Sequence, residues 1–97
     1  MLDEIVRNQI VMLGHQAHAL TESAYRDHPS RRGDPGWAGK QRILLADMAL
    51  HLLQTALREG ELAPAELRRN LFAILTVADQ FSPDDGLKAS AERLLAR

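Results

Sequence analysis

Apolar residues recur at steps of three and four positions along most of this chain, which is the spacing that lines one face of an α-helix. Between residues 2 and 27 the spacing produces one apolar stripe, made of Leu2, Val6, Ile10, Leu13, Ala17, Leu20 and Ala24. We predict a long first helix over this range, with the stripe facing inward.

Residues 38–59 are apolar around most of a helical circumference, and their polar stripe is narrow: Asp47, His51, Gln54, Thr55 and Arg58. A helix that is apolar nearly all round is normally buried, so we predict that this second helix is the most buried.

Turn-forming residues separate the helical segments. Residues 28–39 hold five Pro and Gly residues, a density that interrupts a helix. Within them Asp34-Pro35 has the form of a helix start, with a capping residue followed by a first-turn proline. Gly60 is suited to end the second helix.

Two further helices follow after short connections. The third is predicted from Pro64 to about Gln80, and the fourth, of about 13 residues, opens at Ser82-Pro83-Asp84-Asp85. Short connections favour antiparallel neighbours, and 97 residues leave room for one core. The expected fold is all-α: a single domain over residues 1–97, forming a small four-helix, mainly antiparallel bundle with a long first helix.

Composition narrows the class of protein. The chain has 16 Leu and 14 Ala residues, which favour helix, and no Cys, which removes disulfides and thiolate chemistry. A formal charge of −1 lacks the basic excess of a dedicated nucleic-acid binder. With an acidic start and no long apolar run, the sequence predicts a cytoplasmic protein; ten Arg to two Lys is typical of GC-rich bacteria. No motif ties the chain to a known family.

Histidines are the candidate metal ligands. His15 and His18 lie three apart on the first helix, and Asp47 and His51 lie four apart on the second, so each pair shares a side of its helix. Together they could supply a divalent metal site. If the apolar stripe of the first helix packs on the second, however, the two pairs do not converge. We therefore expect no metal or other cofactor, and we keep a metal site as the alternative.

The side of the first helix opposite its stripe is the candidate partner surface. Val11 stands there among polar residues, and Met12 flanks it. The loop that follows carries two arginines close to the only Trp. The predicted partner-binding residues are Val11, Met12, His15, His18, Glu22, Tyr25, Arg31, Arg32 and Trp37.

Other functions receive weaker support from the sequence. Arg68, Arg69 and Asn70 on the third helix give a faint helix-turn-helix pattern, so a nucleic-acid-binding regulator is a lesser alternative. His51 with Asp47, or His18 with Glu22, is half of a catalytic arrangement without a nucleophile, so no catalytic residue is assigned. The leading hypothesis is a small protein–protein interaction module, regulatory, adaptor or assembly component, acting as a homodimer through the first helix.

Overall fold

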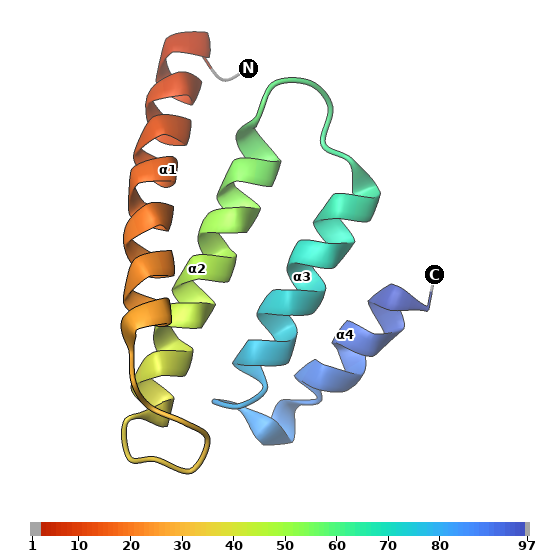
Figure 1. Cartoon of the computed structure of the whole chain (residues 1–97). Coiled ribbons are helices and arrows are strands. Elements are labelled where there is room, and N and C mark those ends of the chain that lie inside the picture. Colours follow the sequence, from red (N-terminus) through yellow and green to blue (C-terminus); the bar gives the residue numbers. More distant parts are fainter. Residues whose placement is uncertain (1–2, 97) are drawn as a thin grey trace.

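Four α-helices and one short 3₁₀ turn make up the computed structural model, which describes residues 3–96 (Figure 1). The helices are α1 (Glu4–Asp27), α2 (Trp37–Leu57), α3 (Pro64–Ala78) and α4 (Leu87–Leu95), and the 3₁₀ turn is Pro83–Asp85. Successive helices run in opposite directions, and α1 is the longest at 24 residues. The predicted all-α fold with antiparallel neighbours and a long first helix is confirmed. No helix in the described range is both long and apolar enough to cross a lipid bilayer.

The four helices lie side by side in sequence order. α1 packs on α2, α2 on α3, and α3 on α4 (Figure 1). The molecule measures 44 × 34 × 16 Å, and four helices in a row at ordinary interaxial distances need a width of about 30 Å. The bundle is therefore open, a single layer in which α1 and α4 form the two edges.

This open arrangement leaves little core. The radius of gyration is 15.1 Å, whereas a compact chain of this length has about 12.5 Å. No large side chain among the described residues is fully buried, and the buried apolar residues are Val77 and Ala91. Although α2 is flanked on both sides, its two buried residues, Gln41 and Asp47, are polar.

The second helix begins within one residue of its predicted range, but the predicted cap at Asp34-Pro35 and the predicted start of the fourth helix are wrong. Asp34 belongs to a turn, where its carboxylate accepts a hydrogen bond from the Arg31 N–H (2.7 Å), and α2 begins at Trp37 after Gly36. The fourth helix does not continue from Pro83, because Gly86 has a φ of 68°. This left-handed conformation ends the 3₁₀ turn and separates it from α4, which has only nine residues.

The predicted inward stripe of the first helix is also wrong. Leu13 and Leu20, at its centre, are 64% and 73% exposed. α1 packs on α2 through its other side, where Gly14 is buried so closely that a Cβ would lie 2.8 Å from Leu53 Cδ2. A residue without a side chain permits this approach, and it therefore decides which side of α1 meets α2.

Candidate functional site

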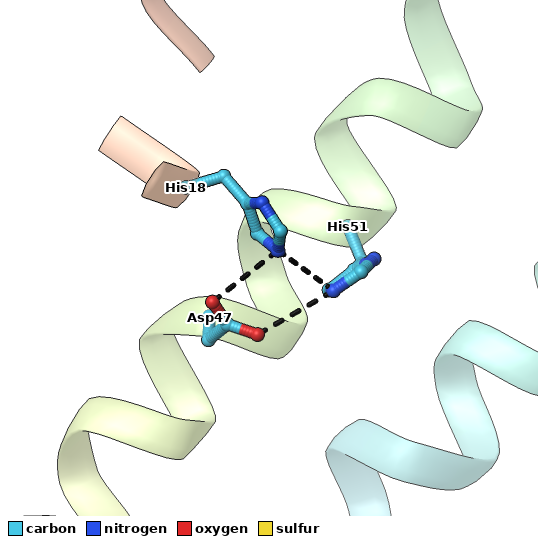
Figure 2. A group of neighbouring side chains, drawn as sticks. All are labelled: His18, Asp47 and His51. Atoms are coloured by element: carbon cyan, nitrogen blue, oxygen red, sulfur yellow. Dashed lines mark hydrogen bonds and ion pairs between the residues drawn. The ribbon is translucent and has the colours of Figure 1, made fainter. Parts of the chain in front are cut away.

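The packing of α1 on α2 brings together a cluster of His18, Asp47 and His51 (Figure 2). Asp47 and His51 are four residues apart and so lie one turn apart on the same side of α2. His18 lies one turn beyond Gly14 on α1, and the helical repeat therefore points it toward α2 as well. The close approach at Gly14 is what lets side chains of two different helices meet here.

The three side chains form a triangle of polar atoms. His18 Nε2 lies 2.9 Å from His51 Nε2, a hydrogen-bond distance at which one ring donates and the other accepts. His18 Nε2 is 3.3 Å from Asp47 Oδ1, and His51 Nε2 is 3.4 Å from Asp47 Oδ2. The two imidazole planes are nearly perpendicular, at 82°. Figure 2 shows both Nε2 atoms turned toward the carboxylate.

Neighbouring residues orient this triangle. The Asp47 side chain is only 9% exposed, and Thr21 Oγ1 donates a hydrogen bond to its Oδ1 at 2.7 Å. A buried carboxylate is costly unless it is paired, so the hydroxyl and the imidazoles stabilise it. On the outer side of His18, the Glu22 carboxylate lies 3.8 Å from Nδ1. Carboxylates therefore lie beside both ring nitrogens of His18.

A cavity of about 310 Å³ adjoins the cluster at His51. His15 lines this cavity and takes no part in the triangle. Gln54 also lines it, and its Nε2 is buried with no acceptor among the described residues. The remaining lining residues are Val11, Thr55 and Arg58. The cavity therefore gives the cluster a polar side that can receive a small ligand.

The structure divides the residues predicted to bind a partner. Three of them face α2 of the same chain: Val11, His18 and Tyr25. Val11 lines the cavity and His18 belongs to the triangle. The Tyr25 ring lies under the Lys40 ammonium, with 4.9 Å between Nζ and the ring centroid. Met12, His15, Glu22, Arg31 and Arg32 are exposed, and Trp37 is half-buried at the start of α2. The prediction that the histidine pairs do not converge is wrong for His18, which meets Asp47 and His51 because α1 packs on α2 through a different side than expected.

The side of α1 expected to be core is an exposed apolar surface. We define the apolar face as Ile5, Val6, Met12, Leu13 and Leu20 of α1 with Ala46 and Ala49 of α2. A groove of about 530 Å³ runs between the helices here, lined by Leu20, Thr21, Ala24, Gly39, Arg42, Ile43 and Ala46. The helical repeat places this groove and the His51 cavity on opposite sides of the α1–α2 contact. Beside the α1–α2 contact, the groove is thus lined mostly by apolar residues and the His51 cavity mostly by polar residues.

Comparison with protein-family models, with curated proteins and with solved structures finds no match to this chain.

Proposed function

We propose that this chain is a helical association module that binds a second copy of itself through the apolar face. The observation that carries the proposal is the surface left exposed by the open layer. The accessible area is 6846 Å², whereas a compact monomer of 10.8 kDa exposes about 5,500 Å². The surplus of about 1,300 Å² exceeds the roughly 800 Å² that each partner buries in a standard interface.

A second copy is the partner that fits this surface best. An exposed apolar face is stabilised when another layer of helices covers it, which is the usual two-layer architecture of a domain. Two-fold symmetry places the apolar face against its own copy, so Leu13 and Leu20 of one chain pack on apolar residues of the other. The exposed alanines of α2 allow the backbones to approach closely.

The homodimer expected from the sequence is retained with a different interface. The side carrying Val11, His18 and Tyr25 is occupied by α2 of the same chain, so the contact between copies moves to the opposite side of α1. Since the chain contains no Cys, it fits a reducing compartment, and we place this assembly component in the cytoplasm.

Sedimentation equilibrium at tens of micromolar tests the proposal. The wild-type chain is expected to sediment at twice 10.8 kDa. The double variant Leu13→Glu/Leu20→Glu is expected to be monomeric, because charges on both sides of the symmetry axis must lose water and repel each other. The matched control is Leu62→Glu, since Leu62 is 44% exposed but lies between α2 and α3, away from the apolar face.

The control is expected to remain dimeric, and circular dichroism verifies that all three proteins keep their helix content. A helical wild-type monomer at this concentration contradicts the proposal. So does a double variant that dimerises as tightly as the wild type.

A further inference from the structure

We infer that His18, Asp47 and His51 form a binding site for a divalent transition-metal ion of the zinc class. This inference is independent of the proposed dimer, because the three side chains lie within the contact between α1 and α2 of one chain and none of them belongs to the apolar face. Two imidazole nitrogens and one carboxylate oxygen are the donor set of zinc sites that keep a fourth position open. The chain contains no thiolate, so the site is expected to prefer metals that bind imidazole well, namely zinc, copper, iron and nickel.

The spacing of the donor atoms matches this chemistry. With bonds of 2.0–2.1 Å in a tetrahedral site, neighbouring donor atoms lie about 3.3 Å apart. Each imidazole lies at this distance from one oxygen of Asp47, His18 Nε2 at 3.3 Å from Oδ1 and His51 Nε2 at 3.4 Å from Oδ2. A rotation of the carboxylate is needed to bring a single oxygen between the two nitrogens, and the three ligand atoms already lie within 4.8 Å of one another. The His18–His51 distance of 2.9 Å must lengthen by about 0.4 Å. The side chain of His51 is 45% exposed, so a small rotation of that ring supplies the difference.

The surroundings of the cluster prepare it for an ion. A ligand histidine commonly directs its other ring nitrogen to a carboxylate, which raises its basicity and fixes its orientation. Glu22 takes that position toward His18 Nδ1, and Thr21 holds Asp47 from behind. Asp47 also supplies a negative charge in a buried place, and a bound cation neutralises it.

Solvent reaches the cluster on the side of His51, whose side chain is 45% exposed. His51 borders both the cluster and the 310 Å³ cavity, so an ion held by the three side chains is accessible from that cavity.

Metal titration of protein that is prepared without an affinity tag and treated with a chelator tests this inference. Calorimetry with Zn²⁺ and visible absorption with Co²⁺ are expected to show saturable binding of one ion per chain. Affinity is expected to fall as the pH is lowered, because protons compete for the imidazole nitrogens.

Two histidine variants make the test specific to the cluster. His51→Ala removes a ligand whose side chain is partly exposed, so the fold is retained and affinity is expected to fall more than the roughly 100-fold that loss of an outer-shell partner causes. His15→Ala is the matched control, since His15 lies one turn from His18 but outside the triangle. It is expected to bind with wild-type affinity.

Absence of saturable one-to-one binding overturns the inference and leaves the cluster as a hydrogen-bonded contact between helices. Equal losses in His15→Ala and His51→Ala also overturn it. The Leu13→Glu/Leu20→Glu variant is expected to bind one ion per chain whatever its oligomeric state, so failure of the dimer proposal and failure of the metal site are distinguished.

Discussion

Gly14 determines how closely α1 and α2 approach. It lies in the middle of a 24-residue helix, where glycine is unfavourable by about 1 kcal/mol relative to alanine. Closer packing between α1 and α2 offsets this cost, because the space of the missing Cβ is taken by the Leu53 side chain of α2. The same approach sets the separation across which His18 reaches Asp47.

Substitution of this glycine is expected to lower stability despite the gain in helix propensity. In Gly14→Ala the new Cβ lies 2.8 Å from Leu53 Cδ2, and such overpacking costs about 1–3 kcal/mol. Gly39→Ala is the matched control, since the nearest atom to its Cβ is 4.0 Å away, and it is expected to stabilise the protein by up to about 1 kcal/mol. Urea denaturation measures both. Equal stabilisation by the two substitutions would show that α1 and α2 are not in close contact at Gly14.

Residue patterns identified the members of the candidate site but not their convergence. The spacing of Asp47 and His51, and the presence of His18 on the preceding helix, are visible in the sequence. Convergence depends on which side of α1 packs on α2. Counting aliphatic residues favoured the side of Leu13 and Leu20, whereas the contact is made by Gly14 and by polar pairs between residues far apart in the chain.

At the scale of the elements, α1 and α2 stabilise each other's C-terminal ends. Lys40 Nζ donates to the His28 carbonyl oxygen at 2.9 Å, just past the end of α1, and lies over the Tyr25 ring. Arg7 Nη1 donates to the Leu57 carbonyl oxygen at 2.9 Å, at the end of α2. Helix C-terminal carbonyls lack intrahelical partners and carry partial negative charge, so a cation from the neighbouring helix satisfies both requirements.

Loss of one such contact is expected to weaken the helix pair. Lys40→Met keeps the length of the aliphatic stem but removes the ammonium from the His28 carbonyl, and the expected loss of stability is about 1 kcal/mol. Lys88→Met serves as the control because Lys88 is exposed on α4, away from both contacts. Thermal unfolding followed by circular dichroism compares the two. A loss in the control as large as in Lys40→Met would contradict the assignment.

Helix boundaries were predictable where local capping determines them. Asp3 accepts hydrogen bonds from the Ile5 and Val6 N–H groups, so α1 begins within two residues of its predicted start. The predicted start of the fourth helix was wrong because Ser82-Pro83-Asp84-Asp85 also suits a 3₁₀ turn. The left-handed conformation of Gly86 decides between the two, and glycine permits that conformation without signalling it in the sequence.

At the scale of the whole molecule, stability is expected to decline toward the α4 edge. α4 has nine residues and packs on α3, whereas α2 has a helix on each side. Local opening costs least where few apolar contacts are lost. Hydrogen exchange followed by mass spectrometry is expected to show faster exchange in residues 87–95 than in the middle of α2. Equal protection of the two helices would show that α4 has additional cover.

The openness of the layer could not be read from the pattern of apolar residues. That pattern supplies enough apolar surface for a closed bundle, and it carries no information about whether α1 meets α4 or a second chain. In the sequence alone, Leu13 and Leu20 fit equally well in a closed bundle, where they would contact α4, and in an open layer, where they would contact a second chain. Only the packing of α1 on α2 through Gly14 turns these leucines away from the rest of their own chain.

The side-by-side order of the helices also has a consequence for how the chain acquires its structure. Each helix packs on the helix that precedes or follows it, so the contacts have low sequence separation, and domains with such local contacts fold in microseconds to milliseconds. During synthesis the N-terminal part emerges first, and α2 can dock on α1 before α3 exists. The pairing that brings His18, Asp47 and His51 together can therefore form as soon as α2 has left the ribosome.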